Sequence, residues 1–210
     1  MYVPRHFAET RVEVLHELIR RHPLGTLVVA AADGLEASHV PFEIDPEPAP
    51  FGTLRCHVAR ANPIWQQISA DRPVLVVFQG EEGYVSPSWY VGKQENGKVV
   101  PTWNYAAVHA YGIANTVQDA AWLRRMVEDL TNRHEQVRAD PWHVSDAPAD
   151  YVEKLLGAIV GIEIPVTRML GKWKFSQNRS AADRQGVITG LERDGTAPQV
   201  DVAAVIKTTL

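Results

Sequence analysis

Basic and polar side chains gather in one predicted strand and the turn that follows it. Alternation along the strand places Arg55 and His57 on one face and Cys56 on the other. Arg60 lies in the turn, and Asn62-Pro63 has the pattern of a helix start with asparagine as its cap. Because a helix N-terminus offers free amides and partial positive charge, this stretch predicts a phosphate site. The alternative is a solvated strand face with an ordinary cap.

A second stretch, Ala37 to Phe42, places a proline inside a strand-like run that contains Ser38, His39 and Val40. Proline lacks an amide proton, so it predicts a sheet edge, a bulge or a strand end. Backbone groups at such a place are free to bind a ligand. A plain edge strand without a ligand is the alternative.

Aromatic residues concentrate in two segments, 84–90 and 101–109. In the second segment Trp103 lies on one strand face, while Thr102 and Asn104 lie on the other. This density is typical of stacking on a planar ligand or of a subunit interface. An aromatic core is the alternative.

The segment from Lys172 to Arg179 alternates basic and aromatic residues and includes Lys174. Basic residues with aromatics between them can indicate nucleic-acid binding. The formal net charge of −4, from 21 Lys and Arg against 25 Asp and Glu, counts against a dedicated nucleic-acid binder. A solvated strand end is the alternative.

Several common catalytic and binding motifs are absent from the sequence. It has neither phosphate-loop pattern, Gly-x-Gly-x-x-Gly or Gly-x-x-x-x-Gly-Lys-Ser/Thr, and no His-Glu-x-x-His or Gly-x-Ser-x-Gly. Cys56 is the one cysteine, so an internal disulfide and a multi-thiolate metal site are excluded. We therefore predict no metal site and assign no catalytic residue, although His39 and His109 could transfer protons.

The 210 residues predict a single domain, covering 1–210, with a C-terminal helical or strand extension. The N-terminus has no signal-peptide pattern, and no apolar stretch is long enough to span a bilayer, so we expect a cytoplasmic protein without a membrane segment. Periodicity and turn signals predict a helix that starts at the Thr10–Glu13 capping box and ends at His22-Pro23, and further helices at 64–70, 119–137 and 147–156. They predict strands at 24–31, 35–44, 51–58, 74–78, 84–86, 99–116 and 159–175, with turns at 81–83 and Asn96-Gly97. Residues 180–191 show a mixed pattern.

The fold class is α+β, mainly antiparallel, because the first strands pair through tight turns.

Taken together and in order, these stretches resemble the PaiB-type FMN-binding negative transcriptional regulators. The resemblance spans almost the whole chain and depends on Met1-Tyr2-Val3-Pro4 with Phe7, Ala37–Phe42, Leu54–Pro63, Tyr84–Tyr90, Val100–Tyr105 with Val108-His109 and Tyr111-Gly112, and Lys174–Arg179 with Asp183-Arg184. Cys56 stands where the family usually has glycine before the histidine.

The resemblance implies an FMN-binding split β-barrel of the flavin-reductase and pyridoxamine-phosphate-oxidase type, and a homodimer with FMN at the subunit interface. The residues that would contact FMN fall into three groups. The phosphate and ribityl chain would contact Arg55, His57, Arg60 and Asn62, with Lys174 and Arg179 completing the site; the flavin edge would contact Ser38, His39 and Val40; and the ring would contact Thr102, Trp103 and Asn104.

The resemblance also implies transcriptional repression, but the sequence has no helix–turn–helix with a basic recognition helix. DNA is therefore a partner by resemblance only, and regulation through a partner protein is compatible with the sequence. The alternative function is an FMN-dependent oxidoreductase, in which the flavin supplies the chemistry. Haem binding is a third hypothesis, since related split barrels bind haem.

Overall fold

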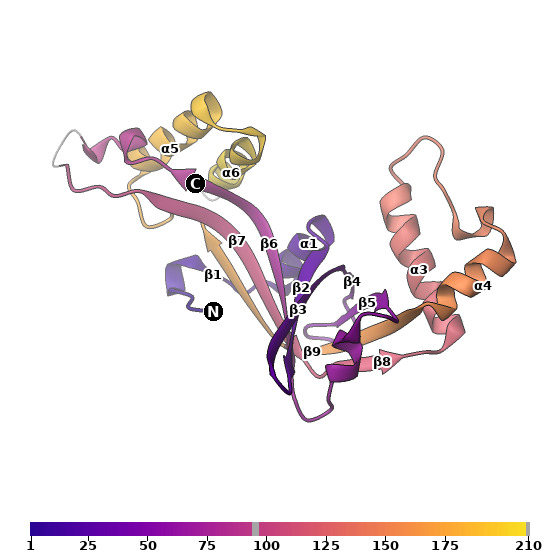
Figure 1. The fold of residues 1–210 in the computed structure, drawn as a ribbon. Helices are drawn as coiled ribbons and strands as arrows, with labels where there is room; N and C mark the ends of the chain where they lie inside the picture. Colours follow the sequence, from indigo (N-terminus) through magenta and orange to yellow (C-terminus); the bar gives the residue numbers. More distant parts are fainter. Residues whose placement is uncertain (94–96, 209–210) are drawn as a thin grey trace. The chain divides into compact units, whose positions relative to one another are not determined.

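The computed structural model describes residues 1–93 and 97–208 and consists mainly of antiparallel strands with flanking helices (Figure 1). The strands are β1 (Ala8–Glu9), β2 (Leu24–Ala31), β3 (Gly34–Pro41), β4 (Glu43–Asp45), β5 (Thr53–Ala59), β6 (Val74–Val85), β7 (Thr102–Gly112), β8 (Asn115–Val117) and β9 (Ile159–Lys174). The α-helices are α1 (Val12–Arg21), α3 (Ala120–Glu135), α4 (Ala149–Gly157), α5 (Ala181–Asp194) and α6 (Ala197–Thr208). Short 3-10 helices are η1 (Arg5–Phe7), η2 (Pro63–Gln67), η3 (Pro87–Trp89) and η4 (Val144–Asp146).

The strands form one sheet in the order β3-β2-β6-β7-β9-β5-β4, with β1 and β8 paired to β9. The pairs of β2 with β3, β4 with β5, and β5 with β9 are antiparallel. The predicted α+β, mainly antiparallel class is confirmed. Strand β3 lies at one end of the path, so the stretch with the internal proline is an edge strand.

The chain divides into two compact units. Unit 1 contains Met1–Leu15, Gln79–Val108 and Leu170–Leu210, and unit 2 contains His16–Phe78 and His109–Met169. Strands β6, β7 and β9 each contribute residues to both units, and we describe each unit by itself below.

Strand alternation positions the core of unit 2. On β5, Leu54, Cys56 and Val58 are buried, whereas Arg55 and His57 are only partly buried. Helix α3 begins at an Asp119 cap whose side chain accepts the amide hydrogen of Trp122, and it packs beside α4 and against β5. The face of β5 that carries Arg55 and His57 is therefore the face under α3.

In unit 1 the C-terminal helices pack against each other and against η3. Val187, Leu191, Val202 and Ile206 are fully buried there. A Cβ placed on Gly190 would lie 2.3 Å from the Trp89 ring, so only glycine allows this close approach.

Several element predictions differ from the structure. The turn predicted at 81–83 does not form, because β6 continues through it beside β7. Sheet pairing overrides the local preference of Glu81-Glu82-Gly83 for a turn. The predicted helix at 64–70 is the shorter 3-10 helix η2, and the mixed segment 180–191 lies in helix α5. The turn predicted at Asn96-Gly97 includes Asn96, which lies outside the described residues.

Over the described parts of the chain, no helix combines the length and the apolar character that crossing a bilayer requires.

Candidate functional site

Two lysines lie on the C-terminal part of β9, in unit 1. The Lys174 Nζ donates a hydrogen bond of 2.6 Å to the Thr102 Oγ1 on β7. Lys172 is only 9% exposed, and its ammonium lies 5.1 Å from the centre of the Tyr105 ring and 6.0 Å from that of Tyr2. A cation over an aromatic face is attracted by the ring quadrupole, so the two tyrosine rings help to hold the Lys172 side chain in place.

Arg179 joins these lysines electrostatically. Its guanidinium lies 4.8 Å from the centre of the Tyr90 ring. Burial lowers the pKa of Lys174, and the positive charges of Lys172 and Arg179 lower it further, while Tyr105 acts in the opposite direction. We call Lys172, Lys174 and Arg179 the cation cluster.

No carboxylate balances the cation cluster. Across residues 1–93 and 97–208, none of its three members makes an ion pair within 4.0 Å. Three neighbouring cations without a counter-ion disfavour one another and favour an added anion. Burial is the main reason that the pKa of Lys174 is lowered, and repulsion from Lys172 and Arg179 adds to it.

Neutral hydrogen-bonding groups accompany the cluster on β7 and after β9. The fully buried Asn104 side chain donates a 3.1 Å hydrogen bond to the Ser176 Oγ. Ser176 has a φ of 63°, a left-handed backbone that costs energy in a non-glycine residue. The Gln177 side chain holds this turn by accepting from the Phe175 amide and donating to the Trp173 carbonyl, both at 2.7 Å.

Trp103 lies on the opposite face of β7 from Thr102 and Asn104, as alternation predicts. It is 48% exposed, and its ring packs edge-on against Tyr84 with 6.1 Å between centres. Its indole N–H donates to Glu82. The structure thus provides an exposed aromatic surface at Trp103, and separates it from the hydrogen-bonding face of the same strand.

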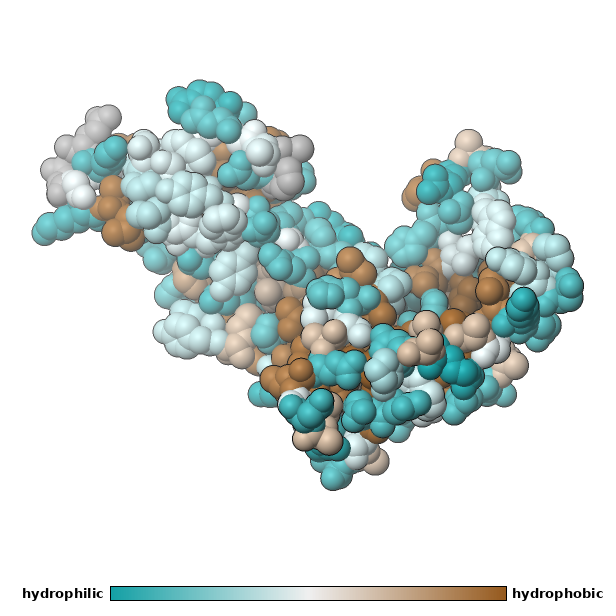
Figure 2. All heavy atoms as spheres, viewed as in Figure 1, coloured by the Kyte–Doolittle hydropathy of each residue, from teal (hydrophilic) through white to brown (hydrophobic). Residues whose placement is uncertain are grey.

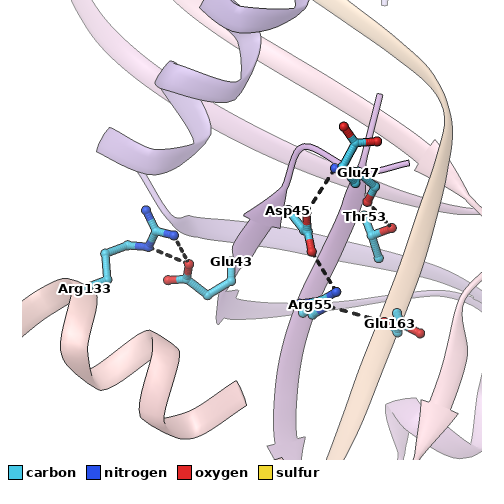
Figure 3. Close-up of polar contacts among 7 residues, drawn as sticks. All are labelled: Glu43, Asp45, Glu47, Thr53, Arg55, Arg133 and Glu163. Atoms are coloured by element: carbon cyan, nitrogen blue, oxygen red, sulfur yellow. Dashed lines mark hydrogen bonds and ion pairs between the residues drawn. The ribbon is translucent and has the colours of Figure 1, made fainter. Parts of the chain in front are cut away.

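The predicted phosphate ligand Arg55, in unit 2, is already paired with two carboxylates. Its guanidinium lies 2.9 Å from the Asp45 Oδ2 and 3.3 Å from the Glu163 Oε1, as Figure 3 shows. Asp45 also accepts the Glu47 amide hydrogen at 3.0 Å. Arg55 therefore links β4, β5 and β9 through their side chains.

A second arginine of unit 2 pairs beside this network. Arg133 of α3 donates to the Glu43 Oε2 of β4 at 2.5 Å (Figure 3). Burial raises the pKa of the Glu43 carboxyl, and Arg133 opposes that rise. The pair connects α3 to the sheet.

Arg60 satisfies backbone carbonyls at the end of α4. Its guanidinium donates to the carbonyl oxygens of Gly157 at 2.9 Å and Ile159 at 3.0 Å, and to the Gln118 side chain at 2.7 Å. The last carbonyls of a helix have no partner within the helix, and a cation is favourable there. Arg60 acts as a side-chain cap for α4.

Asn62 and Ser38 are brought together in unit 2. The Asn62 Oδ1 accepts the Ile64 amide hydrogen at 3.0 Å, and its Nδ2 donates to the Ser38 Oγ at 3.2 Å. The predicted Asn62 cap is thus confirmed. The backbone amide of Ile64, which would be available to a phosphate at the helix start, donates to the Asn62 side chain instead. On the same edge strand His39 is exposed and Val40 is buried.

His57 lies in apolar surroundings under α3 and α4. Its Nδ1 is buried and has no hydrogen-bond partner in the part of the chain that the structure describes. Burial lowers the pKa of the imidazole, so the neutral form is favoured. Its cross-strand partner Gly161 lies against the Trp122 ring, 2.3 Å from where a Cβ would be.

Cys56 stands where the resemblance implies glycine, and its side chain points away from the strand face that carries Arg55 and His57. Its side chain is fully buried on the core face of β5, and burial raises the pKa of the thiol far above its usual range. The thiol is therefore a packed core group.

The described residues fit a phosphate ester best at the cation cluster. Phosphate is a dianion that needs positive charge and hydrogen-bond donors. The sequence predicts Lys174 and Arg179 for this end of FMN; the structure adds Lys172 and Ser176, which belong to the same segment but are not among the predicted contacts. The signal was available for Lys172, because it occupies the same strand face as Lys174 two residues later.

Comparisons with known proteins identify the family to which the chain belongs. Residues 1–168 match a family model described as "Putative FMN-binding domain". An uncharacterized protein of Aspergillus fumigatus is 36% identical, with 99% of this chain and 97% of that protein covered. The protease synthase and sporulation protein PAI 2 of Bacillus subtilis is 33% identical, with 92% of this chain and 90% of that protein covered.

Among solved structures, the FAD and heme binding protein from Mycobacterium smegmatis has a TM-score of 0.60 at 16% identity, over 80% of this chain and 73% of that one. At this identity the likeness concerns the fold, and it confirms the predicted split β-barrel. The chain belongs to the FMN-binding domain family, whose cofactor is FMN, and it is a homologue of the Bacillus protein PAI 2.

Proposed function

We propose that this protein is a flavin-binding regulator that holds the FMN phosphate at the cation cluster of unit 1. The observation that carries the assignment is the absence of any carboxylate paired with Lys172, Lys174 or Arg179 among the described residues. A bound dianion would relieve the mutual repulsion of the three cations and raise the depressed pKa of Lys174.

Neighbouring groups would orient the cofactor without reacting with it. Thr102 and Asn104 hold the Lys174 ammonium and the Ser176 hydroxyl, and so fix the donors of the phosphate site. The contact of Trp103 with the flavin ring remains a prediction, because its exposed indole lies on the opposite face of β7 from Thr102 and Asn104. When bound, FMN supplies one- or two-electron redox chemistry.

The edge strand of unit 2 is a separate contribution. For unit 2 by itself, we propose that the edge strand β3 offers Ser38, His39 and Val40 to a ligand, with the Asn62 Nδ2 donating to the Ser38 Oγ. Arg55 and Arg60 are assigned structural roles, because carboxylates and carbonyls already occupy their donors. His57 is likewise removed from the phosphate site in this proposal, because its surroundings are apolar.

We further propose that the chain acts as a homodimer in the cytoplasm and regulates gene expression through a protein partner. The resemblance of the sequence to negative transcriptional regulators supports a regulatory role, and the Bacillus relative is named a protease synthase and sporulation protein. The formal net charge of −4 counts against direct phosphate-backbone contact with DNA. Light scattering of the purified protein tests the dimer, and a gel shift with its upstream DNA at physiological salt tests direct binding.

An FMN-dependent oxidoreductase is the second candidate function. Trp103 is 48% exposed, so a ring stacked on it would be open to a reactant from solvent. Consumption of NADPH or NADH by the FMN-loaded protein, with a range of electron acceptors, would support this candidate. A flavin-loaded protein without turnover supports the regulator.

The visible spectrum of freshly purified protein is the first test. A flavin absorbance band, or saturable quenching of added FMN fluorescence, is expected. Inorganic phosphate should compete with FMN, and riboflavin, which has no phosphate, should bind much more weakly. Equal affinities for FMN and riboflavin would exclude the cation cluster as the phosphate site.

A further inference from the structure

A cavity of about 400 Å³ lies in unit 2, where α3, η4 and α4 meet β5 and the start of β9. Its volume falls in the range of roughly 300–1,000 Å³ that small-molecule sites occupy. Figure 2 shows hydrophobic side chains gathered in a recess at these helices. The lining residues are His57, Ala59, Val127, Trp142, Val144, Ala147, Tyr151, Val152, Leu155, Leu156, Ala158 and Ile159.

The lining contains no charged side chain, and its polar atoms come from aromatic rings. His57 is held neutral by burial, and Trp142 and Tyr151 each add one polar atom to an apolar ring. A phosphate or carboxylate would lose its hydration here without gaining a cation. The chemistry therefore excludes FMN's phosphate and favours an uncharged ligand.

The mouth of the cavity keeps large apolar side chains in contact with water. Trp142 is 47% exposed, Tyr151 54% and Leu155 48%, and all three line the same cavity. Apolar residues that cluster at a concave site, rather than scattering singly, mark a binding surface. Three of the lining residues, Val144, Val152 and Leu156, form one buried hydrophobic cluster with Leu123, so part of the cavity wall is firmly packed.

We propose that this cavity binds a small, uncharged aromatic molecule that carries one hydrogen-bonding group. The ligand's ring packs against the aliphatic wall and the exposed aromatic side chains, and its polar group bonds to a ring atom of the lining. The site is separate from the cation cluster and acts as a second, independent ligand site. A regulator with such a site can respond to an aromatic metabolite.

The test measures binding of 1-naphthol to the purified full-length protein by isothermal titration calorimetry. One saturable site per chain is expected. 1-Naphthalenesulfonate has the same rings with an anionic group, and should bind at least about tenfold more weakly, because no cation lines the cavity. Equal binding of the two probes contradicts the proposal.

Two substitutions of the same kind separate the cavity from the rest of unit 2. Leu155→Glu introduces a carboxylate into the lining and should weaken 1-naphthol binding at least about tenfold. Val137 is 84% exposed and lies outside the lining, so Val137→Glu should change the affinity less than about twofold. Ala147→Phe is a second variant, in which a larger side chain at the C-terminal end of η4 fills the cavity. Its thermal melting curve shows whether the variant is folded.

Saturating FMN should leave the affinity for 1-naphthol unchanged. If FMN displaces 1-naphthol, the cavity belongs to the flavin site and the proposal is wrong. It is also wrong if 1-naphthol does not bind and Leu155→Glu instead converts an oligomer into monomers by light scattering. That result would show that a second copy of the chain covers the cavity.

Discussion

The cation cluster of unit 1 and the arginines of unit 2 carry like charges in different surroundings. Lys174 donates to a hydroxyl, and its pKa is lowered first by burial and then by repulsion from Lys172 and Arg179. Arg55, in contrast, lies between Asp45 and Glu163. Proteins place a paired arginine where it joins elements, and leave cations unpaired where an anion has to enter.

This contrast predicts opposite effects of removing charge in the two units. Loss of a cation from unit 1 should weaken ligand binding and leave the fold intact. Loss of an arginine from unit 2 should weaken the fold and leave flavin affinity unchanged. The predictions below test the contrast in order of decreasing effect.

The largest effect is expected for Lys174→Met. FMN affinity should fall about 30-fold, because a charged hydrogen bond to phosphate contributes roughly 2 kcal/mol. The free energy of unfolding of the flavin-free protein should stay the same or rise slightly, since a repelled and partly desolvated charge is removed. Fluorescence titration and urea unfolding measure the two quantities. Lys207→Met, which removes a lysine paired with Glu192, is the control and should leave FMN affinity at the wild-type value.

Arg133→Met should destabilise the fold by about 2 kcal/mol, because it leaves the buried Glu43 carboxylate without its partner. This value lies below that of a fully buried pair, since the Arg133 side chain is 35% exposed. Urea unfolding at neutral pH measures the change. Arg138→Met removes an exposed pair with Glu135 and should cost less than about 0.5 kcal/mol. A thirtyfold loss of FMN affinity in Arg133→Met would contradict the expectation that arginines of unit 2 stabilise the fold without binding FMN.

Arg60→Met should cost about 1 kcal/mol, because the carbonyl of Gly157 at the end of α4 and that of Ile159 at the start of β9 lose their donor. Arg60→Lys should recover only part of this loss, since an ammonium cannot reproduce the planar fork. Hydrogen exchange of the α4 amides provides a local readout and should rise in both variants. Unchanged exchange would mean that Arg60 does not cap the helix.

The smallest effect concerns pH and His57. Burial lowers the pKa of its imidazole, so the unfolded chain binds a proton near pH 6.5 and the folded chain does so only at lower pH. The resulting stability is present above pH 6.5 and is lost as the pH falls through the folded pKa. His57→Phe should therefore lose less stability than wild type between pH 7.5 and 5.5. Burial also lowers the pKa of His109, so some pH dependence should persist in the variant.

The elements with a clear period could be predicted from the sequence. Strand β2 and the Asn62 cap follow from alternation and from cap chemistry, and both are found as predicted. The turn at 81–83 could not be predicted correctly, because pairing of β6 within the sheet decides the conformation of a polar, glycine-containing segment. Helices α5 and α6 have apolar residues on more than one side, so their sequences lack a clean helical stripe.

The candidate site also has a part that could be predicted from the sequence and a part that could not. Residue type identified Lys174 and Arg179 as charges able to meet phosphate, and those predictions remain to be tested. The same reasoning could not tell that Arg55 and Arg60 already have partners, since Glu163 and Gly157 are about a hundred positions away in the chain. A charge is recognised from sequence, but its neutralisation depends on long-range contacts.

The single cysteine allows the opening rate of β5 to be measured by thiol alkylation. Cys56 is fully buried in β5, and the raised pKa of its thiol leaves almost no thiolate to react. A thiol reagent can therefore modify the chain only after β5 opens, with one reaction per molecule. The rate of alkylation at high reagent concentration then reports how often the strand opens, without any engineered probe.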